Sequence, residues 1–198
     1  MSGRIPEKDA LIEAEIVSLA DDGCGVAKPE GMVLFVPGTV PGDKALIRVE
    51  KVGKSCLYGK LEKILEPSPE RIEPDCPYFP ACGGCSFRDM TYSAELRWKT
   101  QWVEDHLRRI GGFDLKPEPA LASPEMLRCR NKGIYPAGKD ASGKVVFGFY
   151  RQKSHELIVC RDCLLQPEEF AKILEAAAFW ANGFKISVYD EKTGLGFL

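Results

Sequence analysis

The stretch MVLFVPGTVPGDKALIRVEKV, residues 32–52, contains two apolar runs separated by a segment rich in proline and glycine. Apolar runs of this length, broken by turn residues, are typical of short β-strands. Similar runs lie on either side of it, at LIEAEIVSL (11–19) and SCLYGKLEKIL (55–65). Because short strands with turns between them and no helical period favour a small closed sheet, we expect an OB-like antiparallel barrel over residues 1–66.

Composition places the chain among folded proteins of a reducing compartment. It has 198 residues, 44% of them hydrophobic, and a formal net charge of −2. No run approaches the ~18 apolar residues that a membrane helix needs, and residues 1–16 are too charged for a signal peptide. Eight cysteines are too few for a disulfide scaffold of this length. We therefore expect a cytoplasmic protein with reduced thiols and no membrane partner.

The rest of the chain alternates between helical and strand-like patterns. Five prolines interrupt residues 66–80, where neither a regular helix nor a central strand fits. A helical stripe follows, made of Tyr92, Leu96, Val103, Leu107 and Ile110, and Gly111-Gly112 is expected to end that helix. The remaining expected elements are strands over 128–136, 144–150, 155–159 and 184–191 and a helix over 167–183. The predicted fold class is α+β, with a barrel (1–66), a cysteine-bearing loop (67–90) and a central α+β domain (91–198).

Three cysteines in that loop, Cys76, Cys82 and Cys85, have the spacing C-x5-C-x2-C. The prolines and the pair Gly83-Gly84 between them favour a loop, in which backbone N–H groups can approach the sulfurs. Clustered cysteines in a reducing compartment indicate a metal site. Zinc and a cubane cluster both need four ligands, so a fourth thiol must come from elsewhere in the chain.

Two choices for the fourth ligand stay open on spacing alone. Cys160 and Cys163 form a second C-x2-C, which with Cys82 and Cys85 would make a two-knuckle zinc site. That pairing omits Cys76 and separates the knuckles by 74 residues, more than the ~12–20 that are usual. The other cysteines, Cys24, Cys56 and Cys129, are interpreted as packing residues. The two histidines, His106 and His155, have no metal-site spacing and are interpreted as structural or surface residues.

Several motifs together resemble the iron–sulfur-containing RNA uracil-C5 methyltransferases that act on 23S ribosomal RNA. Residues 12–64, with GCGVA, VLFVPGTVPGD and KALIRVEKV, are similar to the TRAM domain, an RNA-binding barrel. The C-x5-C-x2-C run resembles that family's cluster loop, and RCRNKGIYP with GFYRQKSHELIVCRDCLLQP resembles its central domain. The resemblance implies a [4Fe–4S] cluster held by Cys76, Cys82, Cys85 and Cys163, with Cys160 at a position that is usually not a ligand.

The resemblance also implies an activity. In that family a Rossmann-like C-terminal domain binds S-adenosylmethionine, a cysteine thiolate adds to C6 of a flipped-out uracil, and the methyl group is transferred to C5. No catalytic cysteine, base or methyl-donor loop is recognisable here, and TGLGFL (193–198) directly follows an expected strand. We therefore expect a chain cut before the Rossmann-like domain, inactive alone, in which the cluster is structural.

RNA is the expected partner, specifically 23S ribosomal RNA and not DNA. Residues 128–153 contain seven Lys and Arg against a single acid, Asp140, and a basic surface can bind phosphates. The candidate RNA contacts are Arg130, Lys132, Lys51 and Lys54. Two alternatives remain: a stand-alone RNA-binding module with a structural metal site, and an electron carrier or redox sensor that uses the cluster.

Overall fold

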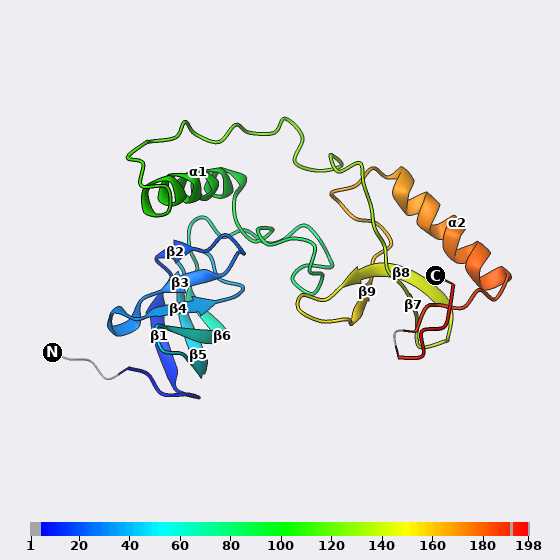
Figure 1. The fold of residues 1–198 in the computed structure, drawn as a ribbon, viewed down its shortest axis with the longest axis horizontal. Coiled ribbons are helices and arrows are strands. Elements are labelled where there is room, and N and C mark those ends of the chain that lie inside the picture. The colour runs from blue at the N-terminus through cyan, green and yellow to red at the C-terminus, as the bar shows by residue number, and fades with distance from the viewer. Residues whose placement is uncertain (1–4, 191, 198) are drawn as a thin grey trace. The chain divides into compact units, whose positions relative to one another are not determined.

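The computed structural model describes residues 5–190 and 192–197. The chain forms two compact units that are interleaved in the sequence (Figure 1). The first contains the described residues up to Asp75 together with Ser86–Ala122, and the second contains Cys76–Cys85 together with the described residues from Ser123 onward. The helix expected over 91–110 thus lies in the same unit as the barrel strands, whereas the domain prediction grouped it with the central domain. The boundaries at residues 66 and 90 stay a prediction.

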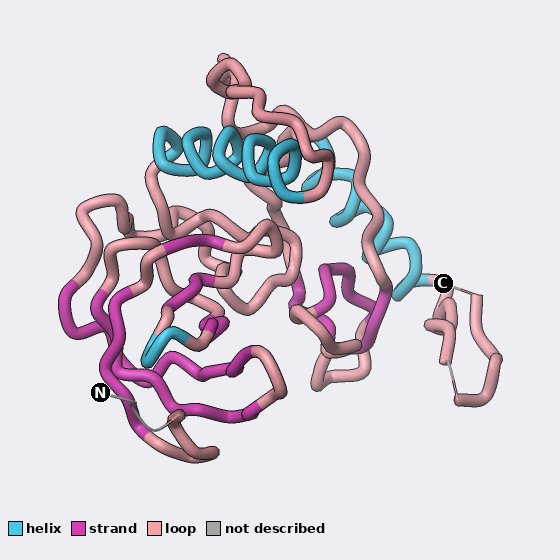
Figure 2. Tube along the Cα trace, turned by 60° about the vertical axis from the view of Figure 1, so that its left-hand side comes forward, coloured by secondary structure: helices cyan, strands magenta, loops and turns pink. Residues whose placement is uncertain are grey.

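The first unit is built on a six-stranded sheet with the order β1-β5-β6-β4-β3-β2. Its strands are β1 (Leu11–Glu15), β2 (Ser18–Leu19), β3 (Gly25–Ala27), β4 (Val33–Val36), β5 (Lys44–Val52) and β6 (Cys56–Glu66), with a 3-10 turn at Pro29–Gly31. The edge strands β1 and β2 follow each other in the chain and are joined by Ile16 and Val17, whose N–H groups donate to Asp43 O at 2.9 Å and Val26 O at 2.8 Å. The bent segment therefore closes the sheet on itself (Figure 2).

The barrel interior follows from the period-2 alternation of the strands. In β5, Ala45, Ile47 and Val49 are fully buried while the residues between them are not, because successive side chains point to opposite faces of a sheet. They pack with the other buried members of one cluster, which are Ile16, Ala27, Leu34, Val36 and Leu57. The second apolar run of residues 32–52 thus forms the expected strand.

The prediction of a purely antiparallel barrel is wrong in one pairing. β4 and β6 run parallel, with Leu34 opposite Leu57. The chain passes from β4 into β5, reverses, and returns as β6, which lies between the two. Since β5 and β6 are antiparallel, this placement makes β6 parallel to β4. Apolar runs and turn residues identify strands, but they do not reveal which strand is inserted between two others.

Helix α1 (Tyr92–Arg109) packs on the first unit and confirms the helix expected over 91–110. The Thr91 side chain caps it by accepting from Ala94 N–H at 3.3 Å. The Trp102 indole N–H donates to Leu19 O at 2.7 Å. Trp98, Trp102 and Phe87 pack against a buried cluster of Leu19, Val40, Met90 and Ala94. The helix is thereby fixed to the barrel through β2 and the segment after β4.

The second unit contains a three-stranded antiparallel sheet, β7-β8-β9, and one helix. Its elements are β7 (Ala137–Lys139), β8 (Val145–Tyr150), β9 (Leu157–Val159) and α2 (Glu169–Gly183). The Asn182 amide accepts from Val145 N–H at 2.8 Å and donates to Val145 O at 2.9 Å, which joins the end of α2 to β8. No helix in the described part of the chain is long and apolar enough to cross a membrane.

Two predicted strands of this unit are wrong. Residues 128–136 form no strand, and β7 begins only at Ala137. The described residues of 184–191 form only an isolated bridge between Asp190 and Leu195, and Glu191 lies outside the described residues. Neither segment is part of the β7-β8-β9 ladder. Some apolar side chains on α2, such as Phe179, are exposed.

Candidate functional site

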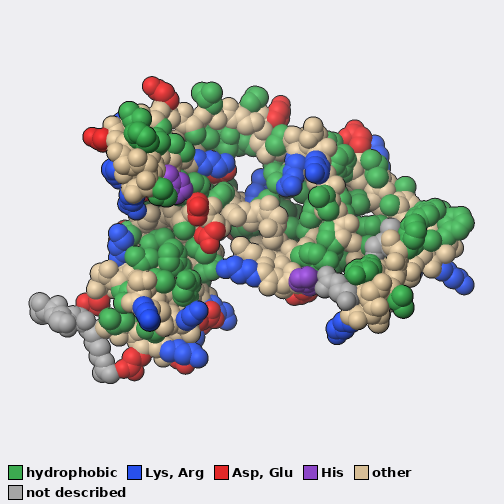
Figure 3. All heavy atoms as spheres, in the orientation of Figure 1, with side chains coloured by type: hydrophobic (Ala, Val, Ile, Leu, Met, Phe, Trp, Pro, Cys, Tyr) green, Lys and Arg blue, Asp and Glu red, His purple; other side chains and the backbone are tan. Residues whose placement is uncertain are grey.

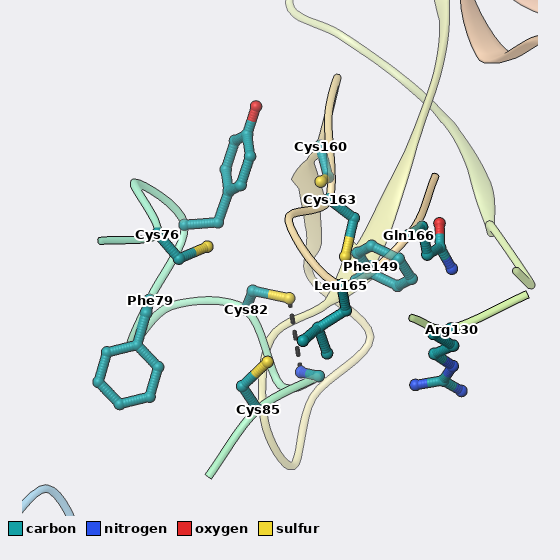
Figure 4. A pocket seen from close by; sticks show the side chains of 12 residues that line it. Cys76, Phe79, Cys82, Cys85, Arg130, Phe149, Cys160, Cys163, Leu165 and Gln166 are labelled. Atoms are coloured by element: carbon teal, nitrogen blue, oxygen red, sulfur yellow. Dashed lines mark hydrogen bonds between the residues drawn. The ribbon is translucent and has the colours of Figure 1, made fainter. Parts of the chain in front are cut away.

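Five of the eight cysteines line one pocket in the second unit (Figure 4). The pocket encloses about 40 Å³. Its lining comprises Cys76, Tyr78, Phe79, Cys82, Gly84 and Cys85 from one loop and Arg130, Phe149, Cys160, Cys163, Leu165 and Gln166 from the rest of the unit. The structure therefore brings the C-x5-C-x2-C run and the C-x2-C pair to the same place, although they are far apart in the sequence.

The loop 76–85 is held against the end of β8 by backbone contacts. Gly83 N–H donates to Tyr150 O at 3.0 Å, and a Cβ on Gly83 would lie 3.0 Å from both Tyr150 O and Gln152 N. Only glycine allows this approach without displacing the loop. Gly84 N–H donates to Cys82 Sγ at 3.4 Å, which is the backbone contact with a sulfur that the sequence predicted.

The side opposite this loop is formed by the segment from Cys160 to Gln166. Cys160 N–H donates to Phe147 O at 3.2 Å, which continues the β8-β9 pairing. The backbone N–H of Arg161 donates to the Tyr78 hydroxyl at 3.1 Å. Tyr78 therefore links the two cysteine-bearing segments directly, and nothing in its spacing identified it beforehand.

Burial and mutual repulsion keep two of these thiols protonated at neutral pH. Cys160 is 3% exposed, and its burial, reinforced by the charges of Cys163, Cys82 and Cys76, raises its pKa to about 12. Burial also raises the pKa of Cys82, and Gly84 N–H partly offsets that rise. A cation bound among the sulfurs would reverse this balance, because metal binding favours the thiolate.

The thiols of the pocket form the donor set that a metal ion or cluster would use. Within residues 5–190 and 192–197, no group of three or more His, Cys, Asp or Glu side chains is arranged to hold one metal ion. The described residues thus show neither a two-knuckle zinc site nor a preformed cluster site, and both stay predictions. In a cubane each thiolate binds a different iron, and an all-thiol ligand set is the one that such clusters use.

Two buried polar atoms beside the thiols have no hydrogen-bond partner among the described residues. These are the Tyr135 hydroxyl and Gln166 Oε1, and Gln166 is 2% exposed. Burial raises the pKa of Tyr135 to about 12, with a further contribution from Cys163 and Cys160. The Tyr135 ring lies 4.8 Å from that of Phe149, a lining residue. Unpaired buried groups are uncommon and mark places where a further group can bind.

The predicted RNA-contact residues fall in both units. Arg130 lines the cysteine pocket, and the Lys132 backbone carbonyl accepts from Gln166 Nε2 at 3.3 Å. In the first unit, Lys51 Nζ lies 5.6 Å from the centre of the Tyr58 ring, and Lys54 lies between β5 and β6. On the face drawn in Figure 3, Lys and Arg side chains are interspersed with Asp and Glu. RNA contact by these four residues stays a prediction.

The cysteines outside the pocket behave differently from one another. Cys24 and Cys56 are partly buried, and Cys24 N–H and Sγ both bond the Asp22 carboxylate. Cys129 is exposed, so its interpretation as a packing residue is wrong. Residues 128–136 do not form the expected strand. No neighbouring strand in the described part of the chain therefore covers Cys129.

One family model matches the residues of the barrel, and several relatives match nearly the whole chain. Residues 7–61 match the TRAM domain family. An RNA methyltransferase of Clostridium tetani, itself described as uncharacterized, is 36% identical over 97% of this chain, and one of Halalkalibacterium halodurans is 38% identical over 96%. Each alignment spans 42% of the relative. Residues 7–61 are thus similar to a TRAM domain. The chain is homologous over nearly its full length to proteins named RNA methyltransferases, and it spans less than half of theirs.

A solved structure gives the corresponding result for the fold. The tRNA (uracil-54, C5)-methyltransferase of Pyrococcus abyssi, solved with S-adenosyl-L-homocysteine, matches 93% of this chain and 40% of its own, with a TM-score of 0.62 and 25% identity. This finding overturns the fold-class prediction, which defined the chain as an α+β fragment by the absence of a Rossmann-like domain. The chain instead has a methyltransferase-like fold.

Proposed function

We propose that this chain is the RNA-recognising and iron–sulfur part of an S-adenosylmethionine-dependent methyltransferase that forms 5-methyluridine in 23S ribosomal RNA in the cytoplasm. The observation that carries the proposal is the match of 93% of the chain to a tRNA uracil-C5 methyltransferase structure. The relatives named RNA methyltransferases agree with it. S-adenosylmethionine is proposed because that structure contains S-adenosyl-L-homocysteine, the product left when the methyl donor has reacted.

A [4Fe–4S] cluster is proposed at the cysteine pocket, with Cys76, Cys82, Cys85 and Cys163 as its ligands. The support is that all four of these thiols line the pocket and that Gly84 N–H donates to the Cys82 sulfur. When bound, such a cluster would cross-link the loop 76–85 to the segment after β9. Cys160, which is the most deeply buried of the five thiols, is not among the proposed ligands.

RNA binding is proposed for the TRAM barrel and for the basic segment 128–153. Lys51 and Lys54 would bind phosphates from the barrel, and Arg130 and Lys132 from the second unit, where Arg130 lines the pocket. Aromatic rings near these cations, such as that of Tyr58 beside Lys51, could stack on unpaired bases. Charge reversal at Arg130 and Lys132 together should weaken binding to a ribosomal RNA fragment and reduce its salt dependence.

Transfer RNA is the second candidate substrate. It is favoured by one observation, that the matched Pyrococcus abyssi structure is a tRNA (uracil-54, C5)-methyltransferase. The two candidates share the reacting base and differ in the RNA that presents it. They are therefore separated by where the methyl group is found and not by the chemistry.

The experiment is deletion of the gene that encodes this chain, followed by mass spectrometry of 5-methyluridine in purified 23S ribosomal RNA and in purified tRNA. Loss from 23S ribosomal RNA, restored by the intact gene on a plasmid, is the expected result. Loss from tRNA alone would replace the first substrate with the second. Unchanged 5-methyluridine in both RNAs would contradict the proposed activity.

A further inference from the structure

One side chain outside the pocket ties together the segment that carries Cys163. The Arg128 guanidinium donates to both carboxylate oxygens of Asp162, at 2.6 and 2.9 Å. The same Nη1 also donates to Cys163 O at 3.2 Å and to Gln166 O at 3.0 Å. A planar guanidinium that binds a carboxylate through two parallel bonds holds it in a defined orientation. Arg128 thus fixes the residue before Cys163, Cys163 itself and Gln166.

The backbone N–H groups of Arg128 and Arg130 bond to the same segment. Arg128 N–H donates to Leu164 O at 2.9 Å, and Arg130 N–H donates to Leu165 O at 2.8 Å. Arg128 has φ of 56°, in the left-handed region that non-glycine residues seldom occupy. Such a conformation persists only where the surrounding contacts specify it, and it is concentrated at functional sites. Here both the side chain and the main chain of Arg128 face residues 162–166.

These contacts change the interpretation of Arg128 in the sequence. It belongs to the basic segment 128–153 that suggested RNA binding, but its fork is occupied by Asp162 and by two backbone carbonyls. An arginine engaged in this way is poorly placed to bind a phosphate as well. The charge of Arg128 holds the segment 162–166 in place. Arg130, in contrast, lines the pocket.

We propose that Arg128 is a positioning residue for Cys163, and that the Arg128–Asp162 pair holds the thiol in the pocket opposite Cys76, Cys82 and Cys85. The purpose of this positioning rests on the proposed cluster site. The contacts themselves are the hydrogen bonds of Arg128 to Asp162, Cys163 and Gln166. Residues that orient a metal ligand without touching the metal typically change affinity about 10- to 100-fold when they are replaced. Loss of Arg128 should therefore loosen Cys163 and weaken retention of iron.

The first test uses the metal-free full chain and needs no cluster. Cys163 is alkylated with iodoacetamide, and its rate is read by mass spectrometry of peptides, with Cys56 of the first unit as the internal reference. Arg128→Met and Asp162→Asn should each speed the alkylation of Cys163 about tenfold relative to Cys56. Arg128→Lys should be intermediate, because an ammonium keeps the charge but not the fork.

The matched control is Arg151→Met. Arg151 makes the same kind of two-bond pair, but with Glu156, at 2.6 and 2.9 Å. Its backbone forms a bridge with Cys82, which a change of its side chain leaves in place. Its Cys163 rate should equal that of the wild-type chain. If Arg128→Met does not fold by circular dichroism, Asp162→Asn decides the matter. A Cys163 rate in Asp162→Asn equal to that of Arg151→Met would overturn the inference.

The second test separates the inference from the proposed cluster. After anaerobic reconstitution with iron and sulfide, Arg128→Met should lose iron to a chelator about 10- to 100-fold faster than Arg151→Met. Equal rates of loss would overturn the positioning role. If the wild-type chain binds no iron, the proposed cluster fails, and the alkylation rates still determine whether Arg128 positions Cys163.

Discussion

Asp43 and Arg71 are joined at the end of the barrel, where Arg71 Nη2 donates to Asp43 Oδ2 at 2.6 Å and Nε approaches both carboxylate oxygens. Asp43 is fully buried, and it also accepts from Val40 N–H at 2.7 Å and Ser68 N–H at 2.9 Å. One carboxylate therefore fastens the turn before β5 to the proline-rich segment after β6. That segment leads directly to Cys76, so the barrel is linked to the start of the cysteine loop.

Replacing Asp43 should destabilise the first unit strongly. Asp43→Asn keeps the size of the side chain but removes the closer of the two carboxylates that pair with Arg71, which leaves only Asp89 at 3.4 Å. Breaking a buried pair in this way costs roughly 3–5 kcal/mol. Urea unfolding followed by tryptophan fluorescence measures the change. Glu66→Gln, which removes the exposed partner of Lys44, is the control and should leave the transition almost unmoved. A similar small effect in Asp43→Asn would contradict the structural role of the pair.

Acid should weaken the same pair, with a sign that follows from the pKa of Asp43. Burial alone would raise this pKa, but hydrogen bonds from Arg71, Ser68 and Val40 together lower it below the ordinary 3.8. The folded chain then binds fewer protons than the unfolded chain, so this stabilisation is present above pH 3.8 and is lost as the pH falls through the lowered pKa. Other acids titrate in the same range, such as Asp89, whose pKa burial raises.

The comparison of wild type with Asp43→Asn isolates that contribution. The difference between their unfolding free energies should be constant from pH 7 to about 5 and should shrink below pH 4. A difference that stays constant down to pH 2 would show that Asp43 does not titrate with a lowered pKa.

One indole hydrogen bond contributes to the packing of α1 on the barrel. Trp102→Phe keeps most of the apolar contact but leaves Leu19 O without its donor at 2.7 Å. The loss should cost about 1–3 kcal/mol, the range for an unsatisfied buried acceptor. Thermal unfolding of Trp102→Phe beside Trp98→Phe measures it, because Trp98 packs on the same cluster. Equal stabilities of the two variants would argue against the bond.

The close approach of Gly83 to β8 predicts a local effect on the cysteine loop. Gly83→Ala places a methyl group 3.0 Å from Tyr150 O and Gln152 N, both backbone atoms that cannot move aside easily. Gly84→Ala meets only Cys82 Sγ, at 3.4 Å. We expect Gly83→Ala to bind several times less iron on reconstitution than Gly84→Ala, with the barrel unaffected in its urea transition. The reverse order of iron content would refute this placement of the loop.

Local patterns predicted the helices well and the connections poorly. The bounds of α1 follow from its period and its Thr91 cap, yet two residues of the predicted stripe, Val103 and Ile110, are exposed. The face that packs carries Trp98 and Trp102, because the barrel and not the helix decides which side is covered. A strand is expected over residues 128–136, but the N–H groups of Arg128 and Arg130 bond to the segment after β9.

The candidate site shows the same division between local and long-range information. Cysteine spacing alone predicted a metal site on the loop 76–85, and all five relevant thiols do line one pocket. Spacing could not rank Cys160 against Cys163, since three residues of separation bring both to the same pocket. The contacts that distinguish them, the burial of Cys160 and the Arg128–Asp162 pair beside Cys163, come from elements distant in sequence.

The most direct test of the central proposal is the iron, acid-labile sulfide and zinc content of the anaerobically purified chain. We predict about four irons and four sulfides per chain with broad visible absorption, as a [4Fe–4S] cluster requires. Cys85→Ser and Cys163→Ser should lose both, while Cys160→Ser and Cys56→Ser should keep them. Stoichiometric zinc without iron would contradict the account.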